Sequence, residues 1–199
     1  MKSWIWKTVI AIVLSVALPV LARADTWQID PVHTSVEFTV RHMMISNVKG
    51  QFQKTSGTIT VNGNDPASAK IEATIDASSV DTRVEGRDEH LKGPNFLDVA
   101  KYPTITFKST KVDAAGPNKW KVTGDLTLHG VTKPVVLDVE AAGPPIHDPM
   151  GNTPAGASAA TTIKRSDFGI TWNKALDTGG VMVGDEVAIA IDIEVIEKK

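Results

Sequence analysis

The sequence predicts an all-β protein, an eight-stranded antiparallel barrel with a short helical insertion between strands. Apolar and polar residues alternate with a period of two along most of the chain, which is typical of strands with one buried and one solvated face. Short turns containing Gly, Asn or Pro join many of these segments. Only residues 79–102 break the alternation, and they carry helix signals instead.

The alternating segments predict the strands in chain order. In the first segment, Phe38 and Val40 share one face with His42, while the polar residues between them face water. The apolar parity of the second segment changes across residues 54–57, which predicts a bulge or a bend. The short link at 129–133 favours an antiparallel hairpin. Strands are predicted over 36–42, 48–61, 69–75, 104–108, 120–128, 135–139, 157–163 and 187–195.

The helical insertion is predicted from its end signals. Thr82 and Glu85 have the spacing of a capping box, and Gly93 followed by Pro94 ends the segment. Residues 95–100 are expected to form a second short helix. Gly86 weakens the first helix by about 1 kcal/mol relative to alanine, so this helix should depend on docking against the sheet.

Eight amphipathic strands fit either a sandwich or a closed barrel. We favour the barrel because closure removes exposed strand edges. An eight-stranded barrel is either just filled by its side chains or hollow enough for one small ligand. Small residues with inward parity favour a hollow, and these are Ala69, Ala73, Gly124, Ala157 and Ala159.

Composition excludes several classes of protein. The 199 residues include no cysteine, which excludes disulfide frameworks, zinc–thiolate sites, iron–sulfur clusters and cysteine nucleophiles. Apolar residues make up 42% and charged residues 22%, which is ordinary for one globular domain.

The amino terminus has the pattern of a secretory signal peptide. Lys2 and Lys7 precede an uncharged run over 8–22, and Ala22-Arg23-Ala24 has the small-x-small form of a cleavage site. The run is shorter than the roughly 20 residues that cross a bilayer. We therefore expect residues 1–24 to be a cleaved signal; an uncleaved anchor is the alternative.

Export predicts a mature domain over 25–199 in a bacterial periplasm or outside the cell. Without Lys2, Lys7 and Arg23, the mature chain has 18 basic against 23 acidic residues, a net charge of −5. Phosphate binding needs a basic surface, so no nucleic-acid partner is expected.

A series of motifs runs through the chain in a characteristic order. They are Asp30–His42, Val48–Phe52, Ser79–Thr82, Arg87–Leu91, Phe96–Val99, Tyr102–Thr110, Thr123–Val135 and Arg165–Gly169. In this order and spacing the sequence resembles the YceI-like family of periplasmic lipid-binding proteins over essentially all of 25–195. The resemblance implies a lipocalin-like barrel that carries a polyisoprenoid or a similar long-chain amphiphile, such as a fatty-acid-like lipid, in an internal tunnel.

The predicted ligand-binding residues are mainly the inward apolar set, although core packing alone also explains each of them. They are Phe38, Val40, Phe52, Leu91, Phe96, Phe107, Leu126 and Trp172. His42 lies on the same face, and it is interpreted either as a hydrogen-bonded residue of the barrel rim or as a contact to a ligand headgroup.

Two further predicted ligand-binding residues lie on the helix. Arg87 and His90 follow Arg83 at i, i+4 and i+7 spacing, so the three would share a side and could bind a diphosphate or carboxylate headgroup. A solvated face of mixed charge is the alternative. Asp88 falls between Val84 and Leu91 on the apolar stripe of the helix, so it needs a partner such as an arginine.

The remaining motifs support neither metal binding nor catalysis. The five histidines have neither His-x-His nor His-Glu-x-x-His spacing, and no Gly-x-Ser-x-Gly elbow occurs. We therefore predict no metal, no cofactor and no catalytic residue, and favour a non-enzymatic carrier. The alternatives are a lipid-modifying enzyme using His42 or His90, and a cell-envelope interaction or stress protein using the loop at 143–156. The sequence leaves a homodimer open.

Overall fold

A computed structural model describes residues 24–63, 65–177 and 179–198. The predicted signal peptide therefore lies outside the described residues except for Ala24. Within these ranges the chain forms three helical segments, η1 (Ala77–Ser79), α1 (Glu85–Lys92) and η2 (Arg165–Phe168). The strands are β1 (Ala24–Ile29), β2 (Ser35–His42), β3 (Ser46–Phe52), β4 (Thr55–Asn62), β5 (Asp65–Asp76), β6 (Val80–Asp81), β7 (Thr104–Gly116), β8 (Lys119–Leu128), β9 (Val131–Ala141), β10 (Pro154–Lys164) and β11 (Val183–Glu197).

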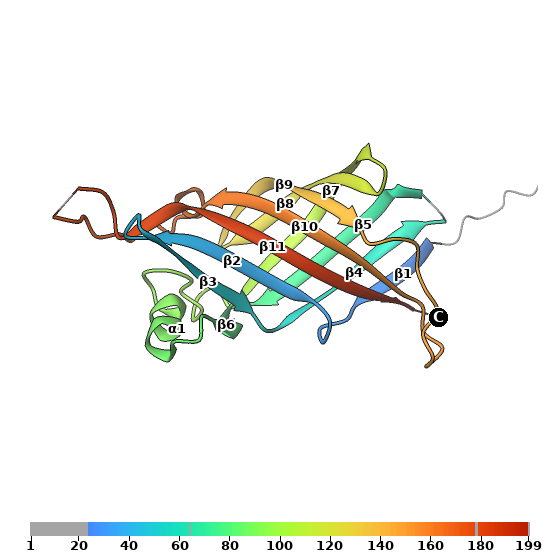
Figure 1. Cartoon of the computed structure of the whole chain (residues 1–199), viewed down its shortest axis with the longest axis horizontal. Coiled ribbons are helices and arrows are strands. Elements are labelled where there is room, and N and C mark those ends of the chain that lie inside the picture. Colours follow the sequence, from blue (N-terminus) through green and yellow to red (C-terminus); the bar gives the residue numbers. More distant parts are fainter. Residues whose placement is uncertain (1–23, 64, 178, 199) are drawn as a thin grey trace, which may run out of the picture.

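All strands belong to one antiparallel sheet that closes on itself (Figure 1). The last strand, β11, pairs with β10 along one edge. Along its other edge it pairs first with β2, where Ala188 lies opposite Thr39, and then with β1, where Trp27 lies opposite Glu197. This double pairing closes the ring.

The eleven strand segments of the described chain make up eight barrel strands, because three of the barrel strands consist of two segments each. The chain leaves the sheet briefly between β1 and β2, between β3 and β4, and between β5 and β6. At the second and third breaks, the amide of Gln53 donates to the carbonyl of Ser79, and that of Asp76 to the carbonyl of Lys54. The predicted barrel is thus confirmed, and the expected bend in the second strand is the break between β3 and β4.

The sequence pattern did not reveal β1 or β6. Strand β1 begins at Ala24, the last residue of the expected signal peptide, and has only six residues, so its alternation is too short to stand out. Pairing defines it instead, since β4 flanks it on one side and β11 on the other. Strand β6 has two residues and pairs only with β3.

The helix differs from the prediction in its first turn. The N-cap of α1 is Val84, which has no capping side chain, so the predicted capping box of Thr82 and Glu85 does not form. The reason is that Thr82 bonds Asp88 through both its amide and its hydroxyl. Val84 is 49% exposed rather than part of an apolar stripe.

The expected second helix at 95–100 is also absent from the described chain, which forms turns there. Backbone amides of this segment bond back to the end of α1: Leu97 donates to Leu91, and Val99 to Lys92. Asp98 takes a left-handed conformation with φ of 45°. These bonds replace the i→i−4 ladder that a helix would need.

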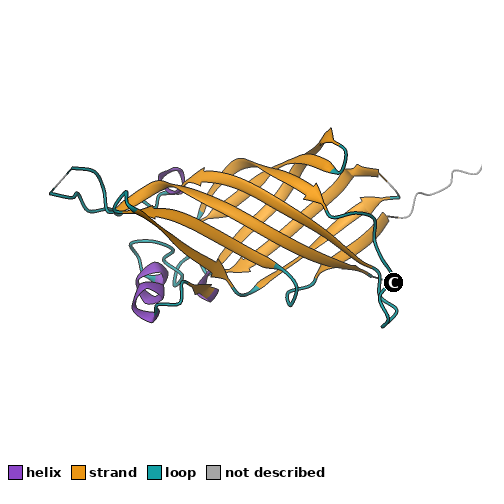
Figure 2. Cartoon of the chain, in the orientation of Figure 1, coloured by secondary structure: helices purple, strands orange, loops and turns teal. Residues whose placement is uncertain are grey.

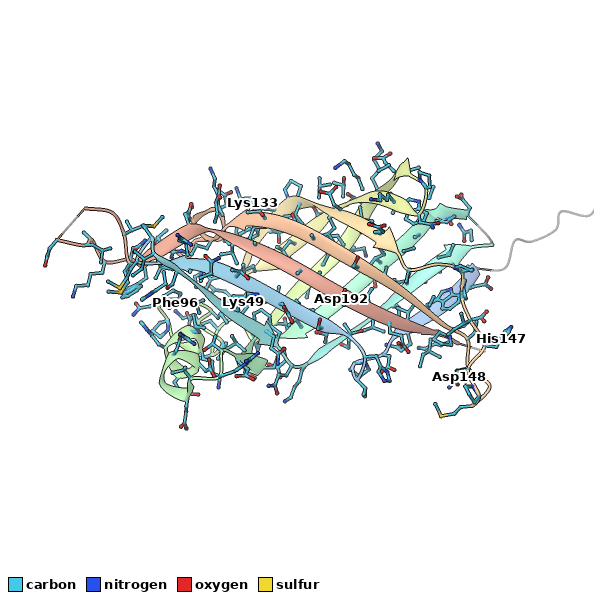
Figure 3. The ribbon with its side chains drawn as sticks, in the orientation of Figure 1. Lys49, Phe96, Lys133, His147, Asp148 and Asp192 are labelled. Atoms are coloured by element: carbon cyan, nitrogen blue, oxygen red, sulfur yellow. The ribbon has the colours of Figure 1, made fainter. Side chains whose placement is uncertain are left out.

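The packed core lies toward one end of the barrel. Figure 2 shows the helical segments gathered at that end, and Figure 3 places Phe96 there, with His147 and Asp148 at the opposite end. The cluster of buried residues consists of Ala77, Phe96, Ile105, Leu128, Ile163, Phe168 and Ile170. Among the described residues α1 is the longest helix at eight residues, so no helix there is long and apolar enough to cross a membrane.

The turn between β8 and β9 gives a test of the fold. His129 and Gly130 both have positive φ, 52° and 73°, as a two-residue hairpin requires, and a Cβ on Gly130 would collide with the ring of Tyr102. We expect Gly130→Ala to lower the free energy of unfolding by about 2 kcal/mol or more, because left-handed strain and the collision add.

Gly63→Ala is the matched control, since Gly63 has φ of 56° but open space around its Cβ position. It should cost only about 1 kcal/mol in urea unfolding, from the backbone alone. Equal losses for the two variants would show that the Tyr102 contact contributes nothing.

Candidate functional site

The barrel encloses an apolar cavity of about 300 Å³. Inward side chains of several strands line it, for example Ile59 on β4, Ile71 on β5, Val139 on β9 and Ile191 on β11. These four residues are only half-buried although they point inward. They face a hollow instead of neighbouring side chains, so the middle of the barrel is not filled by its own residues.

Small inward residues have two opposite effects on this space. Ala73, Ala157 and Ala159 line the cavity and leave room in it, as predicted. Gly124 does not, because the ring of Phe107 lies over it where a side chain would stand. The inference that Gly124 enlarges a hollow is therefore wrong.

Seven of the eleven predicted ligand-binding residues line the cavity together. They are Phe38, Val40, Phe52, Leu91, Phe96, Phe107 and Leu126. They come from β2, β3, α1 with the turn that follows it, β7 and β8, so the fold converges segments that are far apart in the sequence. Their contact with a ligand stays a prediction.

The other four predicted residues do not line the cavity. His90 and Trp172 stack edge to face with ring centroids 5.2 Å apart, and each also contacts the ring of Phe96. His42 ends β2, opposite Ser46 and Val183. The ring of Trp172 thus packs against the core at the α1 end, and the exposed ring of His90 lies against Phe96 and Trp172.

Arg87 has a structural contact of its own. Its Nε donates to the Thr82 hydroxyl at 2.7 Å and one Nη to the Thr82 carbonyl at 2.9 Å. Arg83 lies before the helix, in a left-handed conformation with φ of 64°. The predicted face of Arg83, Arg87 and His90 therefore does not form, because the helix starts too late to hold all three.

Asp88 has a partner, as its position requires, but the partner is not an arginine. Its carboxylate accepts from the amide of Thr82 at 2.8 Å and also from the Thr82 hydroxyl. Thr82 is 5% exposed and lies between the carboxylate and Arg87. The three side chains anchor α1 to the strand before it.

Arg165 is the one buried charged side chain of the cavity lining among the described residues. Its guanidinium donates to the carbonyls of Gly184, Ile170 and Trp172 at 2.8 to 2.9 Å and, more weakly, to that of Val183 at 3.4 Å. Burial lowers its pKa, and the nearby Asp185 carboxylate opposes this shift. No residue pattern predicts this role, because the acceptors are backbone atoms.

A second polar cluster joins the break between β1 and β2 to β11. His33 Nδ1 lies 2.8 Å from a carboxylate oxygen of Asp30 and 3.8 Å from one of Glu194. The hydrogen bond to Asp30 and then the charge of Glu194 raise the pKa of His33, and the same hydrogen bond lowers the pKa of Asp30. Exposed groups of this kind are common without a metal, so we assign no metal to them.

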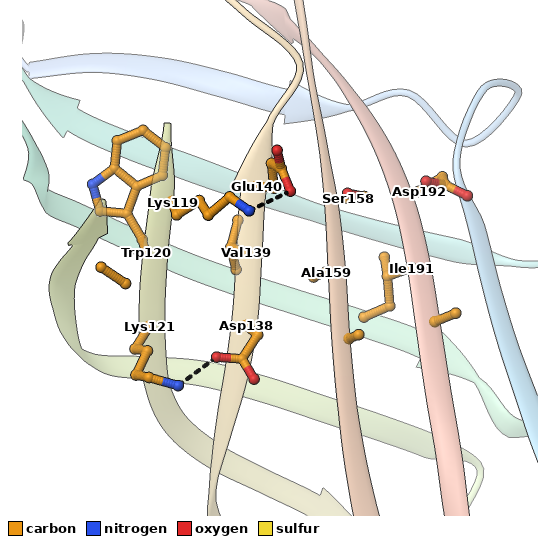
Figure 4. Close-up of a pocket in the computed structure, with 13 residues that line it drawn as sticks. Lys119, Trp120, Lys121, Asp138, Val139, Glu140, Ser158, Ala159, Ile191 and Asp192 are labelled. Carbon is orange, nitrogen blue, oxygen red and sulfur yellow. Dashed lines mark hydrogen bonds and ion pairs between the residues drawn. The ribbon is translucent and has the colours of Figure 1, made fainter. Parts of the chain in front are cut away.

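A wider hollow lies against the outer face of β8 to β11 (Figure 4). Its volume is about 560 Å³, but its wall carries exposed ion pairs, Lys119 with Glu140 at 3.3 Å and Lys121 with Asp138 at 2.6 Å. These charged side chains are already paired with one another and exposed to solvent, so they do not need a ligand. The interior cavity is the better candidate site because it is enclosed by the barrel and almost wholly apolar.

Comparison with known proteins shows what this chain is similar to. The model of the YceI-like domain matches residues 27–195. The UPF0312 protein VPA0850 of Vibrio parahaemolyticus is 40% identical over 172 residues, which cover 85% of this chain and 89% of the relative. The UPF0312 protein SAS2572 of Staphylococcus aureus is 38% identical over 165 residues, covering 83% and 94%.

Solved structures share the fold. The YceI protein of Campylobacter jejuni is 37% identical with a TM-score of 0.66, covering 79% of this chain and 90% of that one. BcnA of Burkholderia cenocepacia is 27% identical with a TM-score of 0.72, covering 83% and 98%. A polyisoprenoid binding domain from Saccharophagus degradans has a TM-score of 0.64 at 17% identity, covering 86% and 98%, and this likeness concerns the fold alone.

Replacing Arg165 tests its role as a buried anchor. Arg165→Met removes the donor from four carbonyls, so we expect a loss of about 3 kcal/mol or more in the free energy of unfolding, measured with urea. The control is Arg41→Met, an exposed arginine bonded to Asn47, which should cost less than about 0.5 kcal/mol. Similar losses for both would contradict the anchoring role.

His33→Gln tests the cluster at the β1–β2 break. A raised histidine pKa contributes stability that is present below its unfolded value of 6.5 and is lost as pH rises through the folded value. A lowered Asp30 pKa contributes stability that is present above 3.8 and is lost as pH falls through the folded value. The difference in melting temperature between wild type and variant should therefore be largest between pH 3.8 and pH 6.5, where both contributions are present.

Thermal melts at about pH 5 and about pH 8.5 measure that difference. Because His33 is exposed, added salt should reduce the effect at the lower pH. A difference that is equal at both pH values would assign it to lost packing instead of charge.

Proposed function

The chain belongs to the YceI-like family, and from this premise we propose that it is a lipid-binding protein that holds one long-chain amphiphile, a polyisoprenoid or a fatty-acid-like lipid, inside its barrel. The cavity is the observation that carries the proposal. Apart from Glu37 and Arg165 its lining carries no charged residue among those described, and Glu37 is exposed. The polyisoprenoid binding domain of Saccharophagus degradans, which has this fold, supports the same ligand class.

The size of the cavity sets limits on the ligand. About 300 Å³ is at the lower end of the range of roughly 300 to 1,000 Å³ for small-molecule sites, which favours a single chain. Each buried CH₂ group contributes about 0.8 kcal/mol, so the part of the chain that the cavity encloses gains enough to offset its ordering. A charged headgroup has almost no polar partner along the lining and belongs at an end of the barrel.

We propose further that the protein is an exported, non-catalytic carrier in the periplasm. The pattern of residues 1–24 supports export. Among the described residues no histidine lines the cavity, so an enzyme that uses His42 or His90 would have neither of these side chains beside an enclosed chain. The carrier therefore needs only to bind the lipid and shield it from water.

The ligand test is a matched pair of substitutions on β10. Ala159 faces the cavity, whereas Ala160 is its neighbour on the exposed outer face. We expect protein purified from a bacterial host to show bound lipid in native mass spectrometry and in organic extracts. Ala159→Phe should lower that occupancy by roughly tenfold by filling the space, with little loss of stability because the space is vacant.

Ala160→Phe should retain the lipid of the wild type. The proposal fails if wild-type protein repeatedly yields no extractable amphiphile, or if both variants carry as much lipid as the wild type. Unchanged thermal melting of Ala159→Phe separates a filled cavity from a misfolded barrel.

A further inference from the structure

The hairpin between β2 and β3 holds two methionines where this turn normally takes Asn and Gly. Met43 and Met44 both have positive φ, 50° and 61°. The amide of Ile45 donates to the carbonyl of His42 at 3.1 Å, which closes a β-turn of the primed type with Met43 and Met44 at its two central positions, inside a loop of three residues between the paired His42 and Ser46. Such turns prefer Asn-Gly because residues with a bulky side chain are strained there. The chain accepts this strain to hold two methionines at the turn.

These residues are exposed in a row. Ile45 is 76% exposed, Met44 50% and Met43 39%. Three consecutive exposed apolar residues are unfavourable in water and usually mark a functional surface. A strained turn with an apolar sequence is therefore a feature that folding alone does not explain.

A second segment adds to this surface. The amide of Met43 donates to the carbonyl of Met182 at 2.7 Å, and Gly180 lies beside the side chain of Met44. Val181, between them, is 38% exposed. We call Met43, Met44, Ile45 and Val181 the apolar tip. Figure 1 shows that the β2–β3 hairpin and the loop before β11 lie at the same end of the barrel, the end that carries α1, and that the loop reaches farther out.

The charge around the hairpin indicates the partner. Residues 39–50 contain Arg41 and Lys49 and no carboxylate, in a chain whose net charge is −2. Both cationic side chains are exposed. In the neighbouring loop Lys174 offsets Asp177. Two exposed carboxylates, Asp185 and Glu186, also lie beside Arg41 at the start of β11, but Asp185 bonds Ser166 and Glu186 lies opposite Lys164. An apolar tip flanked by cations is complementary to the surface of a bilayer that contains anionic lipids.

The tip is continuous with the cavity. Val40 lines the cavity two residues before His42, and Val183, which lines it too, lies opposite His42 in the sheet. The exposed methionines thus begin where the apolar lining ends. Each partner in a stable protein complex buries roughly 800 Å², contributed by about 20 to 30 residues. The apolar tip has only four residues, so it is too small for such an interface, which favours a bilayer over a protein as its partner.

We propose that the apolar tip inserts into the interface of a bilayer containing anionic phospholipids and docks this end of the barrel on the membrane. Arg41 and Lys49 contact the headgroups while the methionines and Ile45 enter the acyl boundary. We also propose that docking allows the cavity to exchange its lipid with the membrane, and this second step rests on the proposed function. The docking itself does not depend on it.

The test uses the full chain and vesicles of phosphatidylethanolamine and phosphatidylglycerol at about 3:1. Wild-type protein should float with these vesicles in a density gradient, and less so at about 0.5 M salt or without the anionic lipid. The double variant M43N/M44G supplies the residues that the turn prefers, so its melting temperature should equal or exceed that of the wild type. Its partitioning onto vesicles should nevertheless fall roughly tenfold or more.

Met150→Ser is the matched control, because Met150 is 83% exposed on the loop between β9 and β10, at the opposite end of the barrel. It should float as the wild type does. A wild type that stays unbound, or a double variant that floats unchanged, overturns the docking proposal. Bound lipid is measured separately: M43N/M44G should retain it, since its cavity lining is unaltered. Flotation of a protein that yields no lipid would refute the proposed function and leave docking intact.

Discussion

Closure of the sheet through β11 is the constraint on which the rest of the structure depends. This strand has 15 residues, and its length lets it pair with β2 over one part and with β1 over another. Backbone hydrogen bonds around a closed ring satisfy the strands without requiring a filled interior. The barrel can therefore leave its middle vacant while one end is packed around Phe96 and Phe168. A cysteine-free chain has no disulfides to support such a hollow, so the ladder and the packed end must do so.

The packed end and the hollow middle follow from the sizes of facing side chains. Near α1, aromatic rings meet one another, as His90, Phe96 and Trp172 do. Farther along the barrel, alanines on β5 and β10 face isoleucines and valines that do not reach across. Glycine contributes differently: Gly50 and Gly124 give space to the rings of Phe38 and Phe107 that lie over them. Most of the cavity wall is formed by side chains that have no polar atom to offer a ligand.

Alternation along the chain was sufficient to predict the strands of the barrel and five of the lining residues, because a period of two fixes which side chains face inward. Leu91 and Phe96 came instead from the helical insertion. It failed where contacts join distant segments. Arg165 bonds backbone carbonyls, which no residue pattern marks. His33 meets Glu194, 161 positions later, only because β11 returns to the start of the barrel. The capping box failed because Asp88 competes for Thr82.

The half-buried interior side chains also bear on the thermodynamics of the protein. In an empty barrel, residues such as Ile71 and Ile191 remain next to water or void and contribute less than a core position does. A lipid in the cavity supplies the missing neighbours and, by mass action, raises the population of the folded state. If the protein binds lipid as proposed, the lipid fills the hydrophobic core of the barrel. The heat capacity change of unfolding then differs between protein purified with bound lipid and protein purified without it.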